Sequence, residues 1–244
     1  MSNRAAWDIR QLLDLIGEDQ IFGDVNRQKR ELPTPGTVRR FYPAGTTIVH
    51  EHQAKQAILI MKAGWAAFVK TQSNGSGLII DFALPHEIAL IEFSGGTSDS
   101  VIALSDITAI ELAGPVRSCL SRYPQPICDA IFLAEMKRYS RATEQLARVG
   151  RRGSLERAIH LLLELGCRAS GSARSYPDRF NCPLTQAQFG DALCLSAVHV
   201  SRVLKALRES GLASFRKGVV ELRNHAALVE KAGFDPAYLQ LTTG

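Results

Sequence analysis

The side chains with the most informative chemistry lie between residues 184 and 223. Within residues 197–210, apolar side chains recur at the i, i+3, i+4, i+7 spacing of one helix face, at Val200, Val203, Leu204 and Leu207. The opposite face of the same helix carries Val198, Ser201, Arg202, Lys205 and Glu209. A helix lying in a DNA major groove presents the N-terminal members of such a face to the base edges. The spacing therefore predicts a recognition helix.

Two capping signals delimit this helix and the one before it. Thr185 and Gln188 have the spacing of a capping box, which predicts a first helix over residues 185–193. After a short turn, Ser196 is placed to cap a second helix over residues 197–210. Two helices joined by a tight turn are the core of a helix-turn-helix.

A basic hairpin follows the two helices. Residues 212–215 and 219–222 read as short strands joined by Arg216-Lys217-Gly218, and phosphate contacts come mainly from Arg, Lys and main-chain amides. The alternative is an ordinary helical pair and hairpin with solvated charges, but the order of caps, turn and basic tip favours a winged helix-turn-helix. The residues predicted to contact DNA are Thr185, Gln186, Ser196, Ala197, Val198, His199, Ser201, Arg202, Lys205, Arg216 and Lys217.

The charge distribution points to the same part of the chain. The net charge is +5, and residues 1–149 hold 16 basic and 16 acidic side chains, whereas residues 150–244 hold 13 and 8. Residues 71–116 contain six acidic side chains and no Lys or Arg. A partner that carries phosphates should therefore approach the C-terminal part.

The composition favours two domains with real cores. The chain has 244 residues, of which 45% are hydrophobic and 22% charged. The charged N-terminal segment predicts neither a signal peptide nor a membrane span, so we expect a cytoplasmic protein. Five cysteines without C-x-x-C spacing indicate free thiols rather than a disulfide framework or a cysteine-ligated cluster. They are Cys119, Cys128, Cys167, Cys182 and Cys194.

The N-terminal half reads as a short helix over residues 6–16 and then an antiparallel β-roll over residues 41–120. Brief β-rich runs occur at residues 46–49, 58–61, 66–69 and 78–80, with glycines between them at Gly45, Gly64, Gly75, Gly77, Gly95 and Gly96. Short strands with this punctuation favour a roll over βαβ units.

A long helix without Gly or Pro is predicted over residues 127–149, with two apolar stripes. One stripe contains Ile127, Ile131 and Ala134, and the other contains Phe132, Met136, Tyr139 and Leu146. One stripe could cover the β-roll while the other pairs with a second copy, or both could be intramolecular core. Gly150-Arg151-Arg152-Gly153 then predicts a hinge, and Ser154 could cap the next helix.

With these motifs in place, the chain resembles the Crp/Fnr family of bacterial transcription regulators. The likeness is strongest from Leu184-Thr185-Gln186 through Val200-Ser201-Arg202-Val203-Leu204 to Leu207-Arg208-Glu209-Ser210-Gly211-Leu212. It implies an α+β fold: an N-terminal antiparallel, jelly-roll-like β-roll over residues 1–122, a dimerisation helix over 123–150, and a winged helix-turn-helix DNA-binding domain over 151–244. It also implies that Ser201 and Arg202 touch DNA, with Arg202 as the base reader, and that RNA polymerase is a partner.

Two positions depart from the family pattern. Val198 stands where many members carry a base-reading Glu, and a valine cannot accept a hydrogen bond from cytosine N4. The operator should therefore differ from the family's usual sequence. Cys194 stands where the turn of the motif usually has Gly.

The resemblance raises the question of an effector. Nucleotide-binding members carry a Gly-Glu-x-Ala-Leu segment and a following Arg-Ser/Thr, and here His86-Glu87-Ile88-Ala89-Leu90 keeps the Glu but not the Gly. The stretch with Thr97 and Ser98 has no arginine, and a buried phosphate without a cation is costly. His86, Glu87, Thr97 and Ser98 remain a possible effector pocket, but we do not expect cyclic nucleotide to bind in the usual way.

Other cofactors are also unexpected. The family's iron-sulfur members have clustered N-terminal cysteines, which are missing before Cys119. His50-Glu51-His52 resembles the first metal motif of cupin enzymes, but Gln56 stands where its Glu would be and no second motif follows, so no metal site is predicted. A cupin-like metal-binding protein with an accessory C-terminal module is the competing interpretation.

The prediction is a homodimer, without catalytic residues or membrane partner, that binds a near-palindromic DNA operator and regulates transcription. A regulator with no small-molecule effector, active whenever it is made, remains an open alternative to a sensor of an unrecognised ligand.

Overall fold

The computed structural model describes residues 37–53, 57–91, 98–113, 125–171 and 176–240. The helix predicted over residues 6–16, the turn at Gly95 and Gly96, Cys119 and Thr97 lie outside these ranges. No helix in the part of the chain that is described is both long and apolar enough to cross a membrane.

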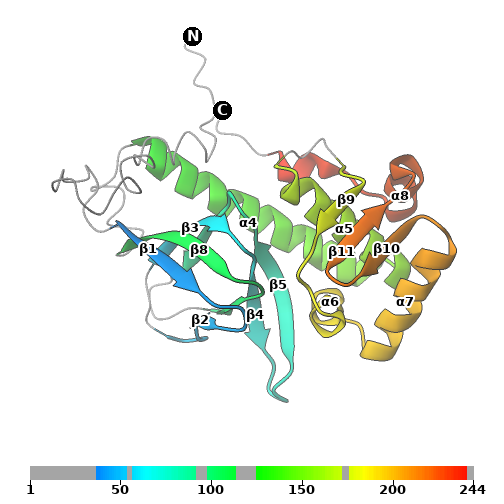
Figure 1. Cartoon of the computed structure of the whole chain (residues 1–244), viewed down its shortest axis with the longest axis horizontal. Helices are drawn as coiled ribbons and strands as arrows, with labels where there is room; N and C mark the ends of the chain where they lie inside the picture. Colours follow the sequence, from blue (N-terminus) through cyan, green and yellow to red (C-terminus); the bar gives the residue numbers. More distant parts are fainter. Residues whose placement is uncertain (1–36, 54–56, 92–97, 114–124, 172–175, 241–244) are drawn as a thin grey trace, which may run out of the picture.

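Two four-stranded antiparallel sheets form the N-terminal half (Figure 1). The first has the order β1 (Thr37–Tyr42), β8 (Ile107–Ala113), β3 (Ala57–Ala63) and β6 (Ile88–Ile91). The second has the order β2 (Thr47–Val49), β7 (Ser100–Ala103), β4 (Ala66–Thr71) and β5 (Gly77–Ala83). Each pair of neighbouring strands runs antiparallel, which confirms the β-roll and excludes βαβ units from it.

An apolar core fills the β-roll. Leu59 and Met61 of β3 pack with Phe68 of β4 and Val101 of β7, all of them buried. The turn between β3 and β4 needs Gly64, because its φ is +83° and a Cβ there would lie 2.1 Å from the Asp106 carbonyl oxygen.

A 27-residue helix, α4 (Gln125–Arg151), follows the β-roll and runs along it towards the C-terminal region (Figure 1). Its Ile127 and Ile131 are buried against Ile58, Ile110 and Leu112, so the first predicted stripe covers the β-roll. The second stripe is not intramolecular core, because Phe132, Met136, Tyr139 and Leu146 are all exposed.

The predicted hinge is shorter than the sequence suggested. Gly150 and Arg151 still belong to α4, and the chain breaks only at Arg152 and Gly153 before α5 (Ser154–Ala169). Gly153, not Ser154, is the N-cap residue, and its N–H donates to Glu156 Oε2 at 2.9 Å. Glu156 therefore satisfies the free N–H of the N-cap residue, whereas the cap that Ser154 was expected to provide is not formed, because Gly153 has no side chain to accept a hydrogen bond.

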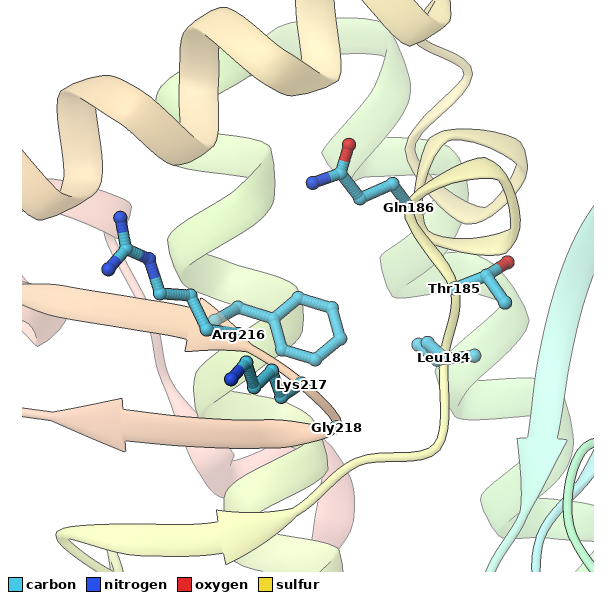
Figure 2. Close-up of a pocket in the computed structure, with 7 residues that line it drawn as sticks. Leu184, Thr185, Gln186, Arg216, Lys217 and Gly218 are labelled. Atoms are coloured by element: carbon cyan, nitrogen blue, oxygen red, sulfur yellow. The ribbon is translucent and has the colours of Figure 1, made fainter.

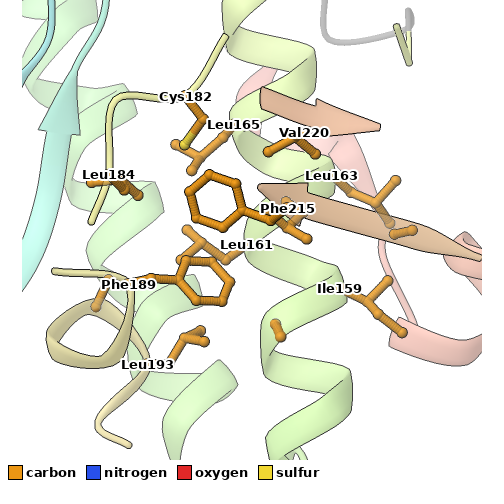
Figure 3. Packing of buried hydrophobic residues seen from close by; sticks show 14 of the residues in the cluster. Ile159, Leu161, Leu163, Leu165, Cys182, Leu184, Phe189, Leu193, Phe215 and Val220 are labelled. Atoms are coloured by element: carbon orange, nitrogen blue, oxygen red, sulfur yellow. The ribbon is translucent and has the colours of Figure 1, made fainter. Parts of the chain in front are cut away.

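The C-terminal region contains β9 (Arg179–Asn181), α6 (Gln186–Leu193), α7 (Ala197–Glu209), β10 (Ala213–Arg216), β11 (Val219–Leu222), α8 (His225–Ala232) and the short 3-10 helix η1 (Pro236–Leu239). Their core is built on α5, where Leu161 and Leu165 face Phe189 of α6 and Phe215 of β10 (Figure 3). The rings of Phe189 and Phe215 meet edge to face with centroids 5.4 Å apart. This packing fixes α6 on the sheet that contains β10.

The two halves share this core. The buried cluster that contains Leu161 of α5 also includes four side chains of the β-roll, Trp65, Ile79, Phe82 and Leu84. The C-terminal region therefore packs directly on the β4–β5 face of the β-roll.

Candidate nucleic-acid interface

The first helix of the pair, α6, begins as the capping box predicts. Thr185 is the N-cap residue, its Oγ1 accepts from the Gln188 N–H at 3.2 Å, and Gln188 Oε1 accepts from the Thr185 N–H at 2.9 Å. Thr185 and Gln186 are exposed at this helix start. Their hydroxyl and amide are therefore available to a ligand.

The turn between the helices is held by backbone geometry. Cys194 adopts the left-handed conformation (φ 54°), where a β-carbon is disfavoured, and its N–H donates to the Gly190 carbonyl. Gly190 itself allows the close approach of the two helices, because a Cβ there would lie 2.8 Å from the Leu195 carbonyl oxygen. Gly190 was not among the residues predicted to matter, although a glycine inside a predicted helix is a signal of close packing.

The second helix, α7, has the predicted two faces. Ser196 caps it by accepting from the His199 N–H, and Val200, Val203, Leu204 and Leu207 are buried. All the predicted contact residues from Ser196 to Lys205 are exposed. Among the described residues Arg202 has no ion-pair partner, while Lys205 lies 3.7 Å from Glu209 at the surface. The Arg202 guanidinium is therefore available to an acceptor outside the chain.

The wing is a three-stranded sheet with the order β10-β11-β9, one strand more than predicted. Arg216 belongs to β10 and pairs with Val219, so the turn consists of Lys217 and Gly218 alone. Both have positive φ, 49° and 74°, as a two-residue hairpin turn of type I′ requires. β9 was missed because its three residues are too few for a periodicity signal, and it adds the exposed Arg179 beside Glu221.

A groove separates the wing tip from the start of α6. It is lined by Thr185 and Gln186 on one side and by Arg216, Lys217 and Gly218 on the other (Figure 2). Leu184 and Phe215 add two apolar side chains to the lining. Cations and hydrogen-bond donors on the two sides of a groove suit the binding of a phosphodiester backbone.

Comparison with known proteins agrees with this geometry. Residues 156–231 match the family model of the Crp-like helix-turn-helix domain. The chain is 26% identical over 203 residues to the cyclic AMP receptor protein of Thermus thermophilus, a match that covers 80% of this chain and 88% of the relative. It is 25% identical over 200 residues to the nitrogen fixation regulation protein FixK of Azorhizobium caulinodans, with coverage of 81% and 78%.

The chain is a transcription regulator of the Crp/Fnr type.

Solved structures of Crp/Fnr regulators have the same fold. FixK2 from Bradyrhizobium japonicum superposes with a TM-score of 0.69 at 21% identity, over 80% of this chain and 96% of that one. The predicted combination of β-roll, long helix and helix-turn-helix is thus confirmed.

The β-roll of this Crp/Fnr regulator holds Glu87 in an ion pair. His86 has a positive φ of 67°, a backbone conformation that favours glycine. Both oxygens of Glu87 accept from Arg168 of α5, at 2.9 and 2.7 Å, and Oε2 also accepts from the Leu84 N–H at 3.0 Å. Burial would raise the pKa of Glu87, but the charge and hydrogen bonds of Arg168, the charge of Arg141 and the Leu84 N–H together outweigh burial, and the pKa is lowered.

Arg168 connects several groups of the two halves. Besides Glu87 it donates to the Phe82 carbonyl at 2.7 Å, to Glu164 at 3.2 Å and to Asp81 at 3.4 Å. Asp81 in turn accepts three hydrogen bonds from Arg141 of α4, at 2.9, 3.2 and 2.7 Å. Burial would raise the pKa of Asp81, but Arg141 and Arg168 lower it.

This network corrects the expectation that the acidic side chains of residues 71–116 lack cations around them. The acidic run over residues 71–116 has no cation of its own, but α4 and α5 bring arginines to it. Arg138 donates to Asp99 at 2.6 Å and lies 4.2 Å from the centroid of the Phe68 ring. Of the other two residues assigned to an effector pocket, Ser98 accepts from Lys70 through its backbone oxygen at 2.8 Å, and Thr97 lies outside the described ranges.

The junction of α4 and α5 is also polar and buried. Arg148 pairs with Glu164, which accepts from the Tyr238 hydroxyl at 2.8 Å. His160 Nδ1 accepts from Arg148 Nε at 3.1 Å. Burial and then the charges of Arg148 and Arg152 lower the pKa of His160 to about 2, so its ring is neutral at pH 7.

The candidate metal motif is engaged otherwise. Glu51 pairs with Lys70 and accepts from the Thr71 N–H at 3.1 Å, while His50 and His52 are exposed. The described residues contain no group of three or more His, Cys, Asp or Glu side chains that could hold a metal ion. The four described cysteines, Cys128, Cys167, Cys182 and Cys194, are free thiols.

Proposed function

We propose that this Crp/Fnr regulator is a cytoplasmic homodimer, without enzymatic activity, that binds a near-palindromic DNA operator and contacts RNA polymerase there. The observation that carries the proposal is the pair of faces on α7, with Val203 and Leu207 buried and Val198, Ser201 and Arg202 exposed side by side. Two copies of α7 would enter successive major grooves, about 34 Å apart.

Each exposed group has a role in this proposal. Arg202 donates two hydrogen bonds to guanine O6 and N7, and Ser201 contacts a neighbouring base or phosphate. These base contacts are flanked by the N-cap residue Ser196 and, on α7, by Ala197, His199 and Lys205. Phosphates are bound from the two sides of the groove by four exposed residues that line it, Thr185, Gln186, Arg216 and Lys217.

The domain division is part of the proposal. Residues 1–122 form the sensing β-roll, residues 123–150 the dimerisation helix, and residues 151–244 the DNA-binding domain. The ion pair of Glu87 with Arg168 supports a regulator that cyclic nucleotide does not control in the usual way, because the carboxylate is already satisfied. Iron-sulfur clusters and metals are not part of the proposed mechanism.

Selection of bound sequences from random DNA at defined salt, with and without cyclic AMP, tests the proposal. We expect a two-fold-related sequence with a guanine in each half-site, the same in both conditions. An absence of any enriched sequence would contradict specific binding, and tighter binding with cyclic AMP would contradict the proposed insensitivity. The salt concentration must be fixed because phosphate contacts make affinity depend on it steeply.

The exposed stripe of α4 supports the homodimer. Phe132, Met136, Tyr139 and Leu146 lie on one helix face, and Tyr139 and Leu146 are 72% and 71% exposed. Large apolar side chains that follow each other along one helix face are suited to pair with a second copy of the same helix.

We expect the double variant Tyr139→Glu/Leu146→Glu to sediment as a monomer at concentrations at which the wild-type chain is a dimer. Two carboxylates per chain in the centre of the helix pair would be desolvated without a partner. Gln72→Glu, in the exposed β4–β5 turn, is the control that adds charge elsewhere and should remain dimeric. A monomeric wild-type chain, or a dimeric double variant, would refute the role of this stripe.

A further inference from the structure

Val198 is an exposed apolar side chain in an otherwise polar setting. It is 60% exposed, and the other large apolar side chains described as exposed lie on β1 and α4. A single exposed valine needs no explanation by itself. Its position does, because it is the second residue of α7, in the turn that a recognition helix brings closest to the bases.

The helix geometry places Val198 beside the polar readers. Ser201 and Arg202 follow it by three and four residues, so the three side chains lie on one face, and all three are exposed. Ser196 fixes the start of the helix through its side-chain hydrogen bond with the His199 N–H. A helix docked so that Arg202 reaches a base edge therefore also brings Val198 to the floor of the groove.

The chemistry of valine restricts which base it can face. It has no donor or acceptor, so the exocyclic amines of cytosine and adenine would lose their water partners beneath it without gaining another. The thymine C5-methyl is the apolar group of the major groove. Because valine keeps essentially one χ1 rotamer in a helix, its two methyl groups are presented without much loss of side-chain entropy.

We infer that Val198 is a specificity residue that packs on the methyl group of a thymine in each half-site of the operator. Its Cα lies about 6 Å along the helix from that of Arg202, so this thymine lies within about two base pairs of the guanine that Arg202 reads. The inference rests on the proposed binding of α7 in the major groove.

The test removes the methyl group from the DNA and the side chain from the protein. Each thymine of one selected half-site is replaced in turn by deoxyuridine, which lacks only the methyl, and the Kd is measured. At one thymine we expect wild-type binding to weaken about four-fold, the effect of one buried carbon. Val198→Ala should bind the unmodified operator more weakly, with no further loss on this replacement.

Two controls sharpen the result. Lys205→Ala should weaken binding but keep the response to deoxyuridine, because it leaves Val198 in place. Replacing the thymine-adenine pair by 5-methylcytosine-guanine should be tolerated better by the wild-type chain than replacement by cytosine-guanine. Val198→Ala should not distinguish these two DNAs.

The outcomes separate this inference from the proposed function. If a selected operator is bound specifically but no thymine responds to loss of its methyl, Val198 does not read thymine. The same holds if Val198→Ala keeps the wild-type response, since another residue would then contact the methyl. If selection enriches no sequence at all, the proposed function fails, and the inference fails with it.

Discussion

Replacing Arg168 with methionine is expected to lower the free energy of unfolding by about 3 kcal/mol at pH 7. Removal of one partner from a buried ion pair costs about 3–5 kcal/mol because the other charge is left without compensation. The lower value applies here because the Glu87 side chain keeps 23% exposure and can draw in water. Asp81 and Glu164 keep Arg141 and Arg148, so Glu87 is the group left alone.

The pH dependence of the unfolding free energy shows whether the unpaired Glu87 charge causes the loss of stability. In the wild-type chain the pKa values of Glu87 and Asp81 are lowered on folding. Their contribution to stability is therefore present above the pKa values of the unfolded chain, about 4.3 for Glu87 and about 3.9 for Asp81, and is lost as the pH falls through the lower pKa values of the folded chain. In Arg168→Met, burial without the Arg168 charge should raise the pKa of Glu87. Acid then protonates Glu87 and removes the unpaired charge. The difference in unfolding free energy between the wild-type chain and Arg168→Met should therefore become smaller below about pH 5.

Urea unfolding at pH 7 and at pH 4.5 measures this effect. Arg208→Met removes an exposed arginine of α7 and should change stability by less than about 0.5 kcal/mol. The double variant Arg168→Met/Glu87→Gln should recover part of the loss, since it removes the unpaired charge. If the free energy of unfolding of Arg168→Met at pH 7 lies within about 1 kcal/mol of the wild-type value, the network does not hold the two halves together.

Replacing Arg202 with alanine should weaken operator binding by roughly 1–3 kcal/mol, or about 5- to 150-fold in Kd. The guanidinium is exposed and has no ion-pair partner in the described part of the chain, so its donors are free for guanine. Removal should also relax specificity, with the four bases at one position bound with similar affinity.

Lys217→Ala is the matched comparison, because Lys217 is exposed at the wing tip, lines the groove and is proposed to contact phosphate. It should weaken all sequences alike and reduce the slope of log K against log salt by about 1. Kd values for the operator and its single-base variants at several salt concentrations separate the two effects. If Arg202→Ala binds the operator as tightly as the wild-type chain, the proposed docking of α7 is wrong.

Much of the DNA-binding unit could be predicted because its signals are local. The capping box of Thr185 and Gln188, the cap at Ser196 and the two faces of α7 all depend on residues within one or two helix turns of each other. The order of these elements and the resemblance to Crp/Fnr regulators were enough to predict the fold. The two stripes of α4 were likewise visible, but which of them the β-roll covers was not.

The sequence by itself determined where α6 and α7 begin, which face of α7 is core and which is exposed, and the place of the basic turn at Lys217. Only the tertiary structure decided that Arg168 meets Glu87, because 81 residues separate them and no periodicity links them. It also decided that α4 and α5 bring arginines to the acidic β-roll, and that β9 completes the wing. Helix faces and caps follow from neighbours along the chain, whereas ion pairs between distant elements depend on how those elements pack.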